Sequence, residues 1–411
     1  MTDVATIVRE VSLLLLVALT VILVTRRLTV PYTLGLVIVG LAIGLLNLTP
    51  EIHLTPDLVL FVFLPALLFE GSWSLSVARL HANWRPIFLL AVPGLLLALV
   101  LIALPLHFFA GLDWLNAFLL ASILSPTDPV AVLGLFRQLK LNENLSTIIE
   151  GESLFNDGVA GALYQTFLAL VLLNIKGEHL TAASVWWQSV GTFVLEAGGG
   201  ILVGLICGFL ISLFVKYIED PLIETTITVV TAYSVYLLAD FVHMSGILAV
   251  IVAGLIFGSY GQSRGISEHA REMVDNFWNM VAFLVNALLF LLVGAQFNTS
   301  LFLNKPNFSQ LAFIAVLSIV AVLIARFIMV VGILPRNPSS QPGIHLRAWR
   351  FVIFWSGLRG ALSLALVLAL PLEIPERDTL IFATYAVVLF TLLVQGFSLR
   401  LLLKRLPSVL R

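Results

Sequence analysis

The chain has 411 residues, of which 60% are hydrophobic and only 11% are charged, whereas a soluble protein carries about 25% charged residues. This composition excludes a soluble globular protein, and its recurring apolar stretches predict an all-α polytopic membrane protein. The net charge of −1, without basic runs, excludes nucleic acid as a partner, and the single cysteine, Cys207, excludes an intrachain disulfide.

About thirteen transmembrane helices are expected, and no cleavable signal peptide precedes them. In chain order the spans cover roughly residues 8–25, 31–48, 55–72, 85–108, 113–138, 143–174, 185–216, 222–242, 246–260, 270–297, 308–334, 346–371 and 377–404. The span at 246–260 is short and rich in glycine. No soluble regulatory domain is expected after the last span, so residues 1–411 form a single transmembrane domain.

The Lys and Arg residues predict the orientation of these spans. Sixteen of the 22 lie in one set of alternate connections and four in the other, while Arg326 and Arg359 fall inside spans. Because Lys and Arg concentrate on the cytoplasmic side of membrane proteins, we expect the N-terminus outside and the C-terminus in the cytoplasm. An odd number of spans likewise requires the two termini to lie on opposite sides of the membrane.

Span 113–138 contains the stretch SPTDP in its middle. Pro126 and Pro129 flank Thr127 and Asp128, and each proline removes a backbone donor and clashes with the preceding turn. The pair predicts an unwound segment with free carbonyls beside a carboxylate. Such a break is tolerated in lipid only where it lines a cavity or a site, so we interpret the segment as functional. The alternative is an ordinary proline kink.

The stretch GESLFNDG, residues 151–158, places four polar side chains inside span 143–174. At 100° per residue, Glu152, Asn156, Ser153 and Asp157 lie at about 0°, 40°, 100° and 140° around the helix, all on one side. This wall predicts a site for one small cation, with Asp157 as its charged ligand. A purely structural polar seam between helices is the alternative.

Span 346–371 is expected to be interrupted in the same way, because Gly357 and Gly360 bracket Arg359 at its middle. The two broken spans hold corresponding places in two inverted six-helix repeats, about 8–174 and 222–404, with 185–216 as the linking helix. Paired interruptions of this kind indicate a transporter site where broken helices cross. We expect Asp128 to face backbone amides there and Arg359 to face carbonyls.

Arg326 lies within span 308–334 and cannot lose its proton, so it must be paired. Glu152 is the best partner, because Asp157 has to remain available for titration. Losing one member of a buried pair typically costs about 3–5 kcal/mol.

Five stretches, in order, resemble those of monovalent cation–proton antiporters of the NhaP and sodium–proton exchanger branch: LPALLFEG, SPTDPVAV, GESLFNDG, LIAR and GLRGALSLAL. The resemblance covers essentially the whole chain. It implies an NhaA-like fold of thirteen helices with a mobile core domain and a dimer domain. It also implies a homodimer in the bacterial inner membrane that needs no cofactor and exchanges Na⁺ or Li⁺, or in some members K⁺, for H⁺.

By position, the resemblance also implies residue roles. The cation and proton site comprises Asp157, Asp128, Ser153 and the backbone carbonyl of Thr127, with Glu70 nearby. Asn156 orients this site. Glu152 and Arg326 form the buried pair, and Arg359 supports the crossed helices. Electrogenic relatives carry two adjacent aspartates. Here the first is Asn156, which predicts electroneutral exchange of one cation for one proton.

An intramembrane aspartyl protease and a cation channel are two alternative classes of protein. An intramembrane aspartyl protease requires a Gly-x-Gly-Asp signature, whereas Asp128 lies in TDP and Asp157 in NDG. A cation channel is disfavoured by the paired interruptions, but a K⁺/H⁺ antiporter of the same fold remains open, because nothing in the sequence selects Na⁺ over K⁺. Glu196, in the middle of span 185–216, has no assigned role.

Overall fold

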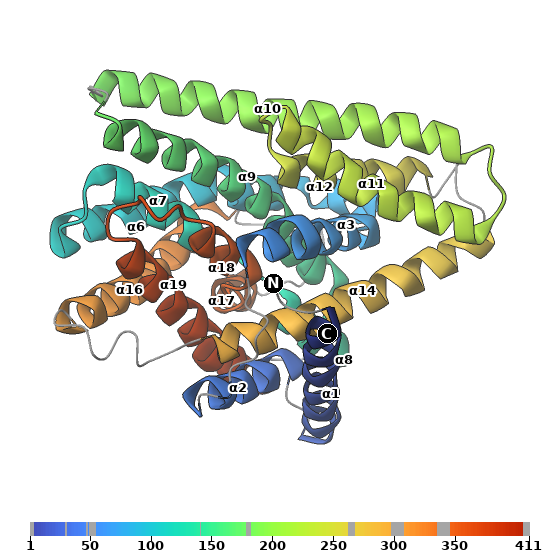
Figure 1. Ribbon diagram of the computed structural model, residues 1–411, viewed down its shortest axis with the longest axis horizontal. Helices are drawn as coiled ribbons and strands as arrows, with labels where there is room; N and C mark the ends of the chain where they lie inside the picture. Colours follow the sequence, from blue (N-terminus) through green and yellow to red (C-terminus); the bar gives the residue numbers. More distant parts are fainter. Residues whose placement is uncertain are drawn as a thin grey trace.

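A computed structural model describes residues 4–28, 31–46, 48, 55–139, 141–177, 182–261, 268–296, 308–334 and 346–405 (Figure 1). Every regular element within these ranges is helical, which confirms the all-α prediction. Several connections expected to be rich in Lys and Arg, including 262–267 and 335–345, lie outside the described residues, as does the tail 406–411.

Each expected span coincides with a described helix or with a helix in two or more segments. The α-helices are α1 (Val4–Leu28), α2 (Tyr32–Leu45), α3 (Leu64–Ser74), α4 (Val77–Ala82), α5 (Trp84–Leu89), α6 (Leu95–Ala110), α7 (Trp114–Leu124), α8 (Val130–Leu139), α9 (Glu143–Ile175), α10 (Ala182–Val215), α11 (Pro221–Phe241), α12 (Gly246–Ile256), α14 (Glu268–Ala295), α16 (Phe308–Ile333), α17 (Leu346–Trp355), α18 (Ala361–Leu368), α19 (Arg377–Phe390) and α20 (Phe397–Arg405). By length and composition, eight helical stretches among the described residues are long and apolar enough to cross a membrane, and four apolar ones are shorter. The number that cross, and the division into repeats at 8–174 and 222–404, stay predictions.

Four π-helical segments were not predicted: η1 (Leu58–Phe63), η2 (Leu90–Gly94), η3 (Phe257–Gly261) and η4 (Thr391–Gly396). Each continues directly into an α-helix or out of one. Pro93 lies inside η2 and accounts for the altered hydrogen bonding there, since proline has no backbone donor. The segment η4 begins at Thr391, whose hydroxyl accepts the backbone amide of Arg359 in the second break.

The helices pack in two groups (Figure 1). The first group contains α1, α2, α3, α11, α12 and α14, and the second contains α6, α7, α9, α16, α18 and α19. The long helix α10 packs along α12 and also contacts α9 and α11, so it touches both groups.

Glycine permits the closest approach inside the first group. A Cβ on Gly40 of α2 would lie 2.2 Å from the carbonyl oxygen of Leu291, and one on Gly294 of α14 would lie 2.4 Å from the carbonyl oxygen of Val37. Small residues at such contacts let backbones approach in a membrane, where van der Waals packing replaces the hydrophobic effect. These glycines therefore bring the backbones of α2 and α14 into close contact.

Both predicted breaks are present and they cross each other. The first lies between α7 and α8, and the second between α17 and α18. The backbone amide of Asp128 in the first break donates to the carbonyl oxygen of Leu358 in the second, at 2.8 Å. Four helix ends consequently meet at one point inside the second group.

Candidate functional site

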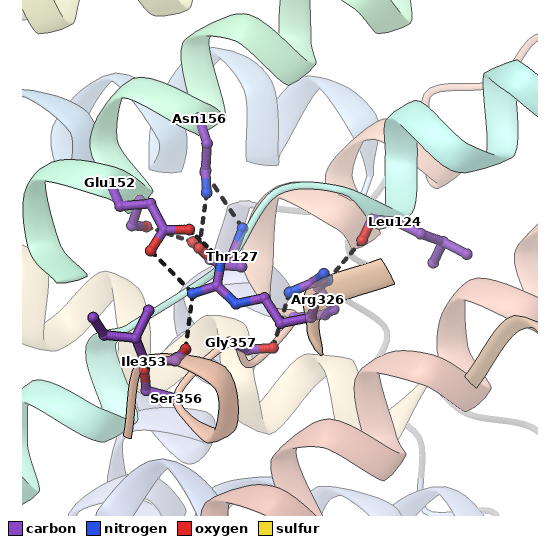
Figure 2. Close-up of polar contacts among 10 residues, drawn as sticks. Leu124, Thr127, Glu152, Asn156, Arg326, Ile353, Ser356 and Gly357 are labelled. Carbon is purple, nitrogen blue, oxygen red and sulfur yellow. Dashed lines mark hydrogen bonds and ion pairs between the residues drawn. The ribbon is translucent and has the colours of Figure 1, made fainter. Parts of the chain in front are cut away.

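The polar wall of α9 divides its side chains among different partners, beginning with Glu152. Arg326 of α16 donates to both carboxylate oxygens of Glu152, and its Nη2 also donates to the carbonyl oxygen of Ile353 at 3.0 Å (Figure 2). Glu152 is 1% exposed and Arg326 4%. The structure thus brings the expected pair together at full burial.

Glycine is needed beside this pair. A Cβ on Gly357 would lie 2.7 Å from Nε of Arg326. Any residue other than glycine at position 357 would therefore push the guanidinium aside. The glycine that helps to interrupt span 346–371 also makes room for the ion pair.

Asn156 and Ser153 both hold the first break, at Thr127. Asn156 donates from Nδ2 to the Thr127 hydroxyl at 2.8 Å and accepts from the Thr127 amide at 3.4 Å (Figure 2). The Ser153 hydroxyl donates to the Thr127 carbonyl. The carbonyl that was expected to be free therefore already has one partner, although its second lone pair remains available.

Asp128 and Arg359 are placed at opposite helix ends, as the sequence predicted. Asp128 accepts from the amide of Val130 at 3.0 Å and from that of Ala361 at 3.3 Å, which are the first residues of α8 and α18. Arg359 donates to the carbonyl oxygens of Leu124 at 2.6 Å and Gly357 at 2.8 Å. Each charge thus faces helix-end dipoles of opposite sign.

The crossing contains a residue that sequence reasoning missed. The hydroxyl of Thr391, at the start of η4, accepts from the backbone amide of Arg359 at 3.0 Å and donates to the carbonyl oxygen of Val388 at 3.0 Å. It satisfies a backbone donor that the break leaves without a helical partner. One threonine in an apolar span gives no signal for this role, since a threonine hydroxyl usually bonds within its own helix.

A cavity of about 120 Å³ lies beside the crossing. All five residues predicted for the cation and proton site line it: Glu70, Thr127, Asp128, Ser153 and Asp157. The described residues supply no hydrogen bond or ion pair to the Asp157 carboxylate, in contrast to Asp128 and Glu152. The cavity lining does not include the other four predicted residues, which bond to the two breaks or to each other: Asn156, Glu152, Arg326 and Arg359.

Three further polar residues line this cavity and were not predicted: Asn286 of α14, Ser363 of α18 and Glu150 of α9. A signal for the first was available, because Asn286 is a carboxamide in the apolar stretch FLVNALLF. Ser363 is two residues beyond the start of α18 and carries no comparable signal.

Crossed discontinuous helices beside a buried carboxylate are the arrangement of secondary transporters, whose substrate sites lie where such helices meet. The fold and site therefore define an ion-coupled membrane carrier. The sequence model of the family described as "Sodium/hydrogen exchanger, transmembrane" matches residues 13–405. The chain belongs to this family, as an NhaP-like monovalent cation–proton antiporter, and is not an enzyme.

Individual relatives agree with this assignment. The low-affinity Na⁺/H⁺ antiporter NhaS1 of Synechocystis is 39% identical over 92% of this chain and 70% of its own length. The Na⁺/H⁺ antiporter NhaH of Halobacillus aidingensis is 34% identical over 97% of both chains. The solved structure of the sodium–proton antiporter MjNhaP1 from Methanocaldococcus jannaschii shares the fold, with a TM-score of 0.75 over 97% of this chain and 98% of that one, at 18% identity.

Proposed function

We propose that the protein exchanges Na⁺ or Li⁺ for H⁺, one for one, by alternating access, with both ions competing for Asp157. The observation that carries this proposal is the contrast among the three acids at the crossing. Glu152 is paired with Arg326, and Asp128 accepts from two helix amides, whereas the Asp157 carboxylate faces the cavity without a hydrogen bond from the described residues.

The cation would be bound by oxygen atoms. Na⁺ is a hard ion that takes several oxygen ligands, and the carboxylates of Asp157 and Asp128, the Ser153 hydroxyl and the Thr127 carbonyl supply them, with Glu70 nearby. All of these residues line the same cavity. The ion is cargo, so no resident cofactor is proposed.

Competition for one carboxylate is sufficient for exchange. When Asp157 binds either H⁺ or Na⁺, the charge that faces the cavity is neutralised. The protein can then change conformation and expose the site to the other side of the membrane. A bare carboxylate would carry its uncompensated charge through the low-dielectric interior, which is costly. Coupling then follows, because the carrier returns only when loaded with one of the two ions.

The cavity faces the side that we propose to be cytoplasmic. On α9 its lining residues run from Glu150 to Asp157, and on α8 they include Val130 and Leu133, so it extends toward the connection that joins these two helices. That connection belongs to the set rich in Lys and Arg. With the N-terminus outside, this cavity would open toward the cytoplasm. We also propose that the protein is a homodimer in the bacterial plasma membrane.

Dissipation of a pH gradient in proteoliposomes tests the function. Na⁺ and Li⁺ should dissipate the gradient, Ca²⁺ should not, and a response to K⁺ alone would make the protein a K⁺/H⁺ antiporter. Asp157→Asn should abolish exchange while the protein still inserts and folds, because the shape is kept and the titrating group is lost. Asp240→Asn, the same change at an exposed position near the end of α11, is the matched control. Substantial Na⁺-driven proton flux in Asp157→Asn would overturn the assignment.

A further inference from the structure

Two residues that line the cation cavity each contain a buried oxygen atom without a hydrogen-bond partner among the described residues. One is Oδ1 of Asn286, whose side chain is 5% exposed, and the other is Oγ of Ser363, which is 1% exposed. Both residues line the cavity that Asp157 faces. Burying a polar atom without a partner destabilises a protein, and most such atoms in folded proteins are bonded. An unpartnered oxygen at a polar cavity therefore indicates a ligand.

The oxygens already assigned to the cation are partly occupied. Both carboxylate oxygens of Asp128 accept backbone amides, and the Thr127 carbonyl accepts the Ser153 hydroxyl. A hard cation needs several oxygen ligands when it leaves water. Asn286 and Ser363 can supply neutral acceptors at the same cavity.

The two residues come from different helix groups. Asn286 is carried by α14, which packs on α2, α3 and α11 in the first group, whereas Ser363 is carried by α18 in the second group, near the crossing. The carboxylate of Asp157 also belongs to the second group, on α9. A cation in this cavity would consequently be bound from both groups at once.

We propose that Asn286 Oδ1 and Ser363 Oγ complete the oxygen shell of the transported cation, directly or through one water molecule bound to it. The proposal rests on the proposed cation exchange and adds two residues to its site. Because both groups are neutral, they raise the affinity for the cation without changing how many protons are exchanged for it. The cavity has room for a cation together with water, since one water needs only about 10–15 Å³ of such space.

Two measurements on the purified full chain test this proposal. The first is the Na⁺ concentration that half-maximally raises the melting temperature in detergent at alkaline pH, which reports binding without transport. The second is the apparent KM and maximal rate for Na⁺ in proteoliposomes. Asn286→Leu, which keeps the volume and removes the acceptor, should raise both Na⁺ concentrations about threefold to tenfold, the value of one hydrogen bond. The maximal rate should remain within about twofold.

A second variant distinguishes a role of Asn286 as an oxygen ligand of the cation from a role in packing. Asn286→Ala leaves space for a water molecule that can replace the lost oxygen, so its Na⁺ affinity should fall less than that of Asn286→Leu. A packing role predicts the reverse order, because alanine leaves the larger void. Ser363→Ala removes a single oxygen and should also weaken Na⁺ binding, about twofold to fivefold. Asn279→Leu is the matched control, since Asn279 is exposed on the same helix and, among the described residues, its side chain donates to the Asp275 carbonyl.

The outcomes separate this inference from the proposed function. If the wild-type protein shows neither Na⁺-dependent stabilisation nor exchange, the proposed function fails. If the wild type responds and Asn286→Leu keeps its Na⁺ affinity within about twofold, the exchange stands and the role of Asn286 is refuted. If Asn286→Leu does not fold, Ser363→Ala and Asn286→Ala decide, and unchanged Na⁺ affinity in both overturns the proposal.

Discussion

Removing one partner of the buried ion pair should cost more stability than any other single change of charge on α9. Glu152→Gln leaves the Arg326 guanidinium charged at 4% exposure without a counter-charge, because the glutamine carboxamide oxygen and the carbonyl of Ile353 are neutral acceptors. An uncompensated buried charge of this kind costs about 3–5 kcal/mol. The free energy of unfolding should fall by that amount, while a correctly inserted fraction still binds Na⁺, because Asp157 is untouched.

Helix α9 supplies a matched control. Glu143 also pairs with an arginine, Arg79, but the two side chains are 78% and 46% exposed. Exposed pairs contribute about 0–1 kcal/mol, so Glu143→Gln should change stability by no more than that. The two variants make the same chemical change on the same helix and differ in burial.

Denaturant titration in mixed micelles, with melting temperature as a second measure, provides the assay. The double variant Glu152→Gln with Arg326→Gln should be clearly more stable than the sum of the two single losses predicts, because neither charge is then left alone. A coupling energy below about 0.5 kcal/mol, within the range of independent sites, would refute the pairing. Equal losses for Glu152→Gln and Glu143→Gln would refute the argument from burial.

Three further outcomes are expected. The proposed competition of protons and Na⁺ for Asp157 predicts that the apparent Na⁺ affinity weakens as the pH falls, approaching about tenfold per pH unit on the acidic limb. A flat dependence in transport assays would require a separate proton site. Exchange should be electroneutral, so an imposed potassium diffusion potential should not shift the Na⁺ flux null point; a shift would mean a second proton, on Asp128 or another acid. Gly360→Ala should reduce Na⁺ affinity at least about tenfold, because its Cβ would lie 1.9 Å from Oδ2 of Asp128 and break charge-assisted bonds to the helix amides. Gly134→Ala, where a Cβ meets nothing within 4 Å, is the control, and equal transport by the two variants would contradict the reasoning.

Much of the site could be predicted because a membrane makes polar residues conspicuous. Asp128 between two prolines could be tolerated only in a broken helix, and the structure has that break. Arg326 cannot lose its proton, so it needed a buried acid, and Glu152 was the acid that the expected role of Asp157 left available. In each case the cost of an unpaired charge in a low-dielectric interior left few arrangements open, so local sequence was sufficient.

Only the tertiary structure decided which neutral groups complete the site. Thr391, Asn286 and Ser363 are far from GESLFNDG in the chain, and a single hydroxyl or carboxamide in an apolar span can equally bond its own helix or face a neighbour. The choice depends on how helices of two separate groups pack and cross, through contacts such as those of α14 with α18 and of α3 with α9. Periodicity within one helix shows which side of it is polar. It contains no information about which side chains of other helices contact that side. In this protein the side chains of several helices together line the cavity.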